Sequence, residues 1–196
     1  ETLHNDLRQA SLIANLPNLT ESNHYLGLQI NAGVMAAASS GMQLVPGTRL
    51  SVYPNAGYNV WAHFAKWPDS RSEFAIGTGI QVEFQGEDLS RRQALGLSWN
   101  EIHGEEYLQR DIRIHGLYGF SKKKIAYGVM AAIDLSHLIL ADRQGFPDYD
   151  ETFLQAVPYF QLMVSDAARL AIMTPVDASG VTVSFRGELL LGRREN

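Results

Sequence analysis

Large apolar residues occupy every second position along most of the chain. In residues 125–140 the odd positions are mainly Ile, Tyr, Val, Ala and Leu, and the even positions hold small residues together with Asp134 and Ser136. The same alternation recurs from Tyr25 to Leu189. A period of two residues is that of a β-strand whose two faces meet different surroundings. The chain is therefore predicted to be all-β.

Clusters of turn-forming residues divide the alternating runs. They lie at 54–57, 67–72, 85–92, 103–106, 121–124, 143–151, 165–168 and 177–180. From Tyr58 on, these turns give eight strands, and the region 24–54 can add an N-terminal hairpin that makes ten. The connections at 121–124 and 165–168 are tight, and the one between them is long. Such asymmetry is typical of outer-membrane barrels with short periplasmic turns and longer external loops.

The polar face of the predicted strands is poor in charged residues. In a soluble sandwich that face lies in water and is rich in Lys, Glu and Asp. Here it is mostly Gly, Ala, Ser, Thr, Asn and Gln, and 19% of all residues are charged, against about 25% in a soluble domain. We therefore predict an antiparallel transmembrane β-barrel over residues 24–192, in the bacterial outer membrane. A soluble, lipocalin-like calyx is the alternative.

The N-terminal residues 1–23 have a helical rather than a β pattern. Leu3, Leu7 and Ala10 share one face of a helix, and Pro17 stops the run. We expect a short amphipathic helix ahead of the barrel. It either packs on a protein core or lies on the membrane surface.

Charge and cysteine content exclude several functions. The net charge is -5 and no long basic run is present, so nucleic acid is not an expected partner. The chain has no cysteine, which excludes thiolate chemistry and disulfides. Because the sequence also lacks the spacings of known metal and nucleotide motifs, we expect no metal and no cofactor. We expect a monomer.

Five ionisable residues fall on the polar parity of their strands. They are Arg113, His115, Asp134, Arg186 and Glu188. An isolated charge buried in a narrow lumen is strongly unfavourable. These side chains are therefore predicted to form charge pairs in the lumen, or to line a narrow path for water.

A histidine and a serine are predicted to face the lumen near the external rim. His63 and Ser98 lie toward the ends of two strands that run outward, both on the lumen parity. An imidazole that takes the hydroxyl proton suits acyl transfer, with neighbouring polar groups to stabilise the oxyanion. The alternative is a hydrogen-bonded lumen pair with no turnover. Glu101 and His103 are candidates to polarise His63, or ordinary solvated residues.

Proline interrupts one predicted strand on its outward face. Pro158 has no N–H, so it removes one donor from the strand ladder and predicts a weak seam in the barrel wall. The alternative is a proline at a bend or bulge.

Several segments in order resemble the outer-membrane lipid A palmitoyltransferases, small barrels preceded by an amphipathic helix. The segments are "VWAHFAK", "LGLSWNE", "AVPYFQLMV" and "AIMTPV", within residues 50–191. The resemblance implies His63 and Ser98 as catalytic residues and Asn100, Gly119, Pro158 and Pro175 as substrate-binding residues. Leu97 stands where the family has an acidic residue, so Glu101 is the candidate third catalytic residue by its position above Ser98. It places Pro158 and Pro175 at openings for lipid, and Gly119 where the end of the acyl chain needs room. Leu97 and Ala62 depart from the family pattern.

From these residues we predict an acyltransferase that moves a palmitoyl-type chain from phospholipid to lipid A, which would be its two lipid partners. The alternative is a non-catalytic outer-membrane barrel, namely a narrow channel, an adhesin or an anchoring module.

Overall fold

The computed structural model describes residues 24–37, 41–55, 57–66, 73–84, 90–140, 149–177 and 180–193. These ranges contain twelve strands and no helix. The strands are β1 (His24–Ala37), β2 (Gly41–Asn55), β3 (Tyr58–Lys66), β4 (Phe74–Phe84), β5 (Arg91–His103), β6 (Tyr107–Lys122), β7 (Ile125–Leu140), β8 (Tyr149–Ser165), β9 (Ala168–Met173), β10 (Val176–Asp177), β11 (Gly180–Val181) and β12 (Val183–Arg193). The helix predicted for residues 1–23 lies outside the described residues. Within these ranges, no helix has the length and apolar character needed to cross a membrane.

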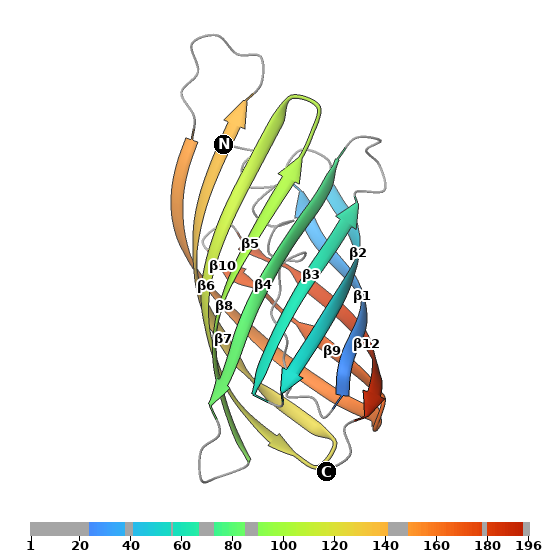
Figure 1. Ribbon diagram of the computed structural model, residues 1–196. Helices are drawn as coiled ribbons and strands as arrows, with labels where there is room; N and C mark the ends of the chain where they lie inside the picture. The colour runs from blue at the N-terminus through green and yellow to red at the C-terminus, as the bar shows by residue number, and fades with distance from the viewer. Residues whose placement is uncertain are drawn as a thin grey trace.

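The strands form a closed antiparallel barrel (Figure 1). Each strand from β1 to β8 pairs with the next, β8 pairs with β9, and β9 pairs with β12. The barrel closes where β12 pairs with β1, with Leu191 opposite Leu26. β9 and β10 are two parts of one barrel strand, and β11 and β12 are two parts of the next, so the wall has ten strands.

The strand number corrects the first of the two predicted counts. Eight barrel strands do follow Tyr58, but the region 24–54 adds the hairpin β1–β2, whose strands pair from Leu26 opposite Val52 onward. An eight-stranded barrel is therefore wrong, and the ten-stranded alternative is correct. The hairpin belongs to the wall because β1 pairs with β2 on one edge and with β12 on the other.

The two faces of the wall differ as the alternation predicted. Large apolar side chains on alternate positions are exposed on the outside, among them Ile30, Leu95, Ile114, Tyr127 and Leu154. The other parity faces the lumen and is buried. An apolar outer band around a polar interior is the arrangement of a barrel that spans a lipid bilayer, so the soluble calyx is excluded.

The two rims of the barrel carry different connections. β3 and β7 run toward the rim that holds the connections 67–72 and 141–148, which we call the long-loop rim. The opposite, tight-turn rim holds the turn at Lys123 and Lys124, where Lys123 has a φ of 55°. By the general pattern of outer-membrane barrels, the long-loop rim is the external one.

Prolines explain why one barrel strand is broken between β9 and β10. In a hydrogen-bonded antiparallel pair, each of two opposed residues donates its N–H to the other's carbonyl. The Thr174 N–H donates to the Pro158 carbonyl at 3.0 Å, and the Thr182 N–H donates to the Pro175 carbonyl at 2.9 Å. Neither proline has an N–H to return. The broken strand thus lacks one hydrogen bond on each of its two edges, with β8 at Pro158 and with the next strand at Pro175.

Candidate functional site

The lumen is the part of the molecule where polar and charged side chains gather. The buried ionisable residues that face it include Arg49, Arg92, Arg113, Arg169, Arg186, Asp111, Asp134 and Glu188. Most of these residues occupy the polar positions of their strands, which alternate with apolar residues that face the lipid. Because water is excluded from these side chains, each needs hydrogen bonds or an opposite charge within the barrel.

Arg113 and Asp134 form the central ion pair of the lumen. They lie directly opposite each other on β6 and β7, and Arg113 donates through Nε and Nη2 to the two carboxylate oxygens at 2.7 and 3.0 Å. Both side chains are 1% exposed. A two-point contact of this kind fixes the orientation of both groups. The predicted pairing of these two charges is confirmed.

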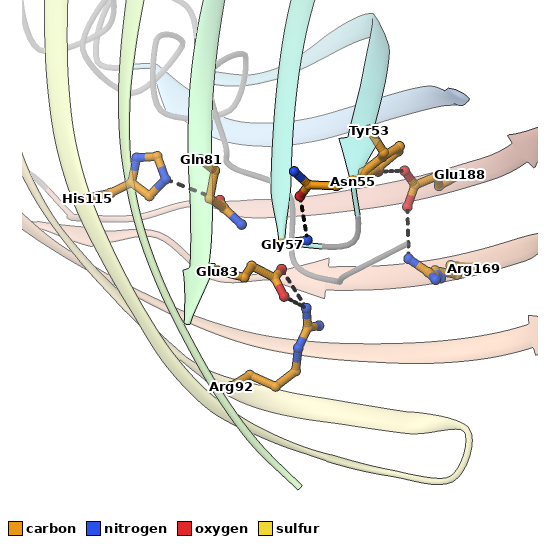
Figure 2. A network of polar contacts seen from close by, with 9 residues as sticks. All are labelled: Tyr53, Asn55, Gly57, Gln81, Glu83, Arg92, His115, Arg169 and Glu188. Atoms are coloured by element: carbon orange, nitrogen blue, oxygen red, sulfur yellow. Dashed lines mark hydrogen bonds and ion pairs between the residues drawn. The ribbon is translucent and has the colours of Figure 1, made fainter. Parts of the chain in front are cut away.

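A second group of polar contacts lies toward the tight-turn rim (Figure 2). Arg92 on β5 donates to both oxygens of Glu83 on β4, at 2.6 and 2.7 Å. Glu188 on β12 accepts the Tyr53 hydroxyl at 2.7 Å, and Arg169 lies 4.0 Å from its other oxygen. Both carboxylates therefore have an arginine partner in the lumen.

The remaining predicted lumen charges bind neutral partners. Nε2 of His115 lies 3.3 Å from the amide oxygen of Gln81, and Nε of Arg186 donates to the amide oxygen of Asn31 at 3.1 Å. Both are nevertheless buried. The sequence indicated their burial but not that amides would bind them.

Large lumen side chains lie flat against the wall because glycines make room for them. An added Cβ at Gly27, Gly77, Gly79, Gly96 or Gly128 would meet the ring of Tyr53, His63, Trp61, His115 or Tyr159, respectively. We call these five ring side chains the lumen braces. Each starts on one strand and covers a glycine on the strand beside it, as Trp61 on β3 covers Gly79 on β4. The braces tie neighbouring strands together from inside.

An apolar cluster lies inside the barrel at the long-loop rim. It consists of Val45, Ala65, Ala75, Ile102, Tyr107 and Leu138, one from each strand from β2 to β7, and none is more than 9% exposed. We call this cluster the apolar collar. The Tyr107 hydroxyl donates to Glu73 Oε1 at 2.8 Å, which holds its ring at the rim. The collar places apolar side chains at the mouth of the lumen, and a second buried apolar cluster, which includes Leu117, Met130 and Val157, lies deeper inside the barrel.

The structure places His63 against Asn100. Nε2 of His63 donates to the amide oxygen of Asn100 at 2.9 Å, and Asn100 in turn lies 3.4 Å from Asp111 Oδ2. Nδ1 of His63 has no hydrogen-bond partner within the part of the chain that the structure describes. A catalytic histidine normally has a group that orients that second nitrogen.

Ser98 faces the lumen next to a different side chain. It lies opposite Gly79, the glycine that Trp61 covers. His63 and Asn100 instead lie on either side of Gly77, two residues away on β4. The predicted lumen orientation of Ser98 is what the structure shows, and its side chain is 2% exposed.

Glu101 lies on the other face of the wall from His63. Its carboxylate accepts Arg110 Nε at 2.8 Å and lies 3.0 Å from His103 Nε2. Because successive residues of a strand point to opposite faces, Glu101 points outward while Asn100 points inward. Glu101 and His103 bind each other, and the structure does not bring them to His63.

The other predicted substrate-binding residues are at separate places. Gly119 faces the lumen as expected, but the hydroxyl of Tyr159 fills the space above it. Pro158 is exposed on the outer face of β8, and Pro175 is buried within the broken strand, between β9 and β10. The structure therefore does not gather these residues around one cavity.

Sequence reasoning missed the apolar collar and most of the arginines. Ile102 and Leu138 are apolar residues on the polar parity at the ends of their strands, and this break in the alternation was the available signal. Arg49 and Arg169 also lie on the polar parity and are buried, as is Arg186, which the alternation did predict to face the lumen. Among the described residues, no three His, Asp or Glu side chains converge as a metal site.

Neither a protein-family model nor a curated protein matches the sequence. Solved structures do match the fold. The KdgM porin in complex with disordered oligogalacturonate has a TM-score of 0.50 at 3% identity, over 84% of this chain and 99% of the porin. Omp33 from Acinetobacter baumannii gives 0.42 at 8%, over 86% of this chain and 98% of that one. The translocator domain of the autotransporter NalP from Neisseria meningitidis gives 0.42 at 10%, over 94% of both chains.

The likeness to the KdgM porin shows the fold, which is that of an outer-membrane β-barrel. It corrects the resemblance to the lipid A palmitoyltransferases, which was wrong. The barrel has ten strands rather than eight, and one solved structure with a matching fold is a porin. In the segment VWAHFAK, which suggested the family, Trp61 and His63 are lumen braces.

Proposed function

We propose that the barrel is a narrow, non-catalytic channel of the outer membrane, closed by the apolar collar in the conformation described. The observation that carries this proposal is a lumen with charged groups from the Glu83–Arg92 pair to the Asn100–Asp111 contact, ending in the collar. Fixed charges attract and hydrate ions, and an apolar constriction stops them by excluding water.

The sharing of a fold with a porin supports this proposal only as an analogy, because one fold serves many functions. The lumen itself supplies the specific support. Ionised side chains are unfavourable at membrane depth, and they are found where they line an ion or water path or where they pair. The wide, open lumen of a large porin does not suit buried arginines such as Arg49 and Arg113, each 1% exposed.

Opening would require water to enter the collar. Burial of one Leu or Ile side chain contributes about 1.5–3 kcal/mol. A collar variant with one such side chain replaced by serine should therefore shift the equilibrium between closed and open lumen by roughly 10- to 100-fold. Ile102 and Leu138 are suitable positions because both are buried and belong to the collar.

The test is ion conductance of the purified barrel in planar bilayers. We expect a small conductance for the unmodified chain, and an increased open fraction for Ile102→Ser and Leu138→Ser. Ala94→Ser is the matched control, since Ala94 is on the same strand and lumen face as Ile102 but outside the collar. Folding of each variant is checked by the mobility shift on heating in SDS. If the folded collar variants pass no more current than bare lipid, the channel proposal fails and an anchoring barrel is favoured.

A further inference from the structure

A row of oxygen-bearing side chains crosses the lumen face just below the apolar collar. Asp111 on β6 is directly opposite Ser136 on β7, and Ser136 is directly opposite Glu151 on β8. Directly opposed residues of an antiparallel pair have Cβ atoms about 4.5–5.5 Å apart, so the serine lies between two acidic residues. Ser136 is two residues from Leu138, a collar residue on the same face of β7. We call these three residues the acidic row.

The acidic row is buried at one end and reachable at the other. Asp111 is 2% exposed and Ser136 is 4% exposed. Glu151 is partly exposed, and it lies on the same face of β8 as the buried Phe153. Because β8 begins at Tyr149, Glu151 is close to the long-loop rim. The row therefore has access to the external side of the barrel.

Two oxygens at the acidic row are buried without a hydrogen-bond partner among the described residues. They are Oγ of Ser136 and Oε1 of Gln109. Gln109 is two residues from Asp111 on the same face of β6, and its Nε2 donates to that carboxylate at 2.9 and 3.1 Å. Its oxygen is thereby left to accept from another group. A buried oxygen without a partner is unfavourable, so each of the two calls for a donor or a cation.

This part of the lumen wall has a net negative charge. The ionisable side chains on the described lumen face of β6 to β8 are Asp111, Arg113, His115, Asp134 and Glu151. Arg113 makes its two-point contact with Asp134. The basic residues Arg110 and His137 of the same strands point to the outer face, where each contacts a carboxylate of that face. Three carboxylates against one arginine favour a cation over an anion at the row.

We infer that the acidic row binds a calcium ion. Its protein ligands are the carboxylates of Asp111 and Glu151, with Oγ of Ser136 and Oε1 of Gln109, and water completes the coordination. Ca²⁺ takes about six to eight oxygen ligands in a flexible geometry, whereas Mg²⁺ demands a regular octahedron and dehydrates reluctantly. A set with oxygen atoms alone does not suit zinc or copper.

The bound ion would join β6, β7 and β8 directly below the collar. Two charged ligands are few for a calcium site, so we expect a dissociation constant on the order of 10⁻⁴–10⁻³ M. Binding is measured without any current through the barrel, and the inference therefore does not rest on the proposed function.

The experiment is a calorimetric titration of Ca²⁺ into the folded barrel. The barrel is held in a nonionic detergent and treated with EDTA beforehand, so that neither lipid phosphates nor residual metal contribute. We expect one strong site for Ca²⁺ and weaker binding of Mg²⁺ in a parallel titration. Folding of each variant is checked by the mobility shift on heating in SDS.

Two substitutions in the acidic row should weaken binding. Asp111→Asn removes one of the two charged ligands and should raise the dissociation constant about tenfold or more. Ser136→Ala removes a neutral ligand and should raise it about two- to tenfold. Ser184→Ala is the matched control and should change nothing. Ser184 is also a buried serine whose hydroxyl has no partner among the described residues, but Gly33 and Met173 lie opposite it.

Two adjacent carboxylates on β8 test where the ion lies. Glu151 faces the lumen, and Asp150, whose side chain is 81% exposed, faces outward. Glu151→Gln should weaken binding as Asp111→Asn does, and Asp150→Asn should not. The inference is overturned if the unmodified barrel binds no Ca²⁺ or prefers Mg²⁺, or if folded Asp111→Asn and Ser136→Ala bind as tightly as it does. A loss in Asp150→Asn equal to that in Glu151→Gln would also overturn it, since the ion would then lie outside the lumen.

Discussion

Replacing Gly79 by alanine should destabilise the barrel from inside. A Cβ at this position would lie 2.6 Å from Cε2 of Trp61 and 2.8 Å from Cβ of Ser98, distances far shorter than two carbon atoms tolerate. Trp61 cannot move away easily, since it is 1% exposed and the Arg49 guanidinium lies 5.0 Å from its ring centroid. Overpacking of this kind costs about 1–3 kcal/mol, so the free energy of unfolding should fall by that amount.

Gly116 provides the matched control on the outer face of the same wall. An alanine there would meet only Cδ2 of Leu95, at 3.5 Å, which is an ordinary contact. Gly116→Ala should instead raise the free energy of unfolding by about 0.4–1 kcal/mol, because alanine loses less backbone entropy on folding. The two substitutions add the same methyl group to a strand, and the expected effects have opposite signs.

The assay is unfolding by urea in lipid vesicles, followed by tryptophan fluorescence. Trp61 and Trp99 lie on opposite faces of the wall, and both report loss of the barrel. Gly79→Ala should lower the urea midpoint and Gly116→Ala should raise it. If the two variants shift the midpoint equally, the explanation of the lumen braces by glycine space is refuted.

Three further predictions use the same unfolding assay. Arg113→Ala should lower the free energy of unfolding by about 3–5 kcal/mol because it leaves Asp134 buried without its ion pair. Arg113→Leu combined with Asp134→Leu should recover most of this loss, and an equal loss in the double variant would contradict the prediction. Pro158→Ala should raise the free energy of unfolding by about 0.5–1.5 kcal/mol, since the alanine N–H can donate to the Thr174 carbonyl. A lower urea midpoint would disprove the explanation that Pro158 weakens the pairing of β8 with the broken strand. Lys123→Gly should raise the free energy of unfolding by about 1 kcal/mol because the φ of 55° favours glycine; no change would show that the turn is unstrained.

Much of the wall could be predicted because strand faces have a period of two. The alternation in residues 125–140 identified the lipid face and the lumen face of β7, and the turns at 121–124 and 165–168 gave its neighbours. The closing contact between β1 and β12 could not be predicted, since their registers join residues more than 140 positions apart, as in Leu28 opposite Leu189. The number of strands depends on that contact, so the sequence allowed either eight or ten strands.

The lumen was predictable in part for the same reason. Burial of charge requires a partner, and parity placed Arg113 and Asp134 on the same side of adjacent strands, where they pair. Parity does not say which side chain crosses a neighbouring strand. The bond from Tyr53 to Glu188 spans β1, and it depends on the missing side chain of Gly27. His63 and Ser98 both face the lumen, yet His63 contacts Asn100, which is two residues from Ser98 on β5.

The hydrogen bond between Tyr53 and Glu188 also bears on the order in which the barrel assembles. Tyr53 is on β2 and Glu188 is on β12, so the bond joins the first hairpin to the last strand across the closure. It can form only after β12 has reached β1, when the whole wall is present. Until then, the carboxylate that accepts Tyr53 and Gln29 is absent from the lumen side of the hairpin. A chain that ends before β12 would leave the hairpin without this acceptor. The bond therefore stabilises the closed barrel and contributes nothing to a partly assembled one.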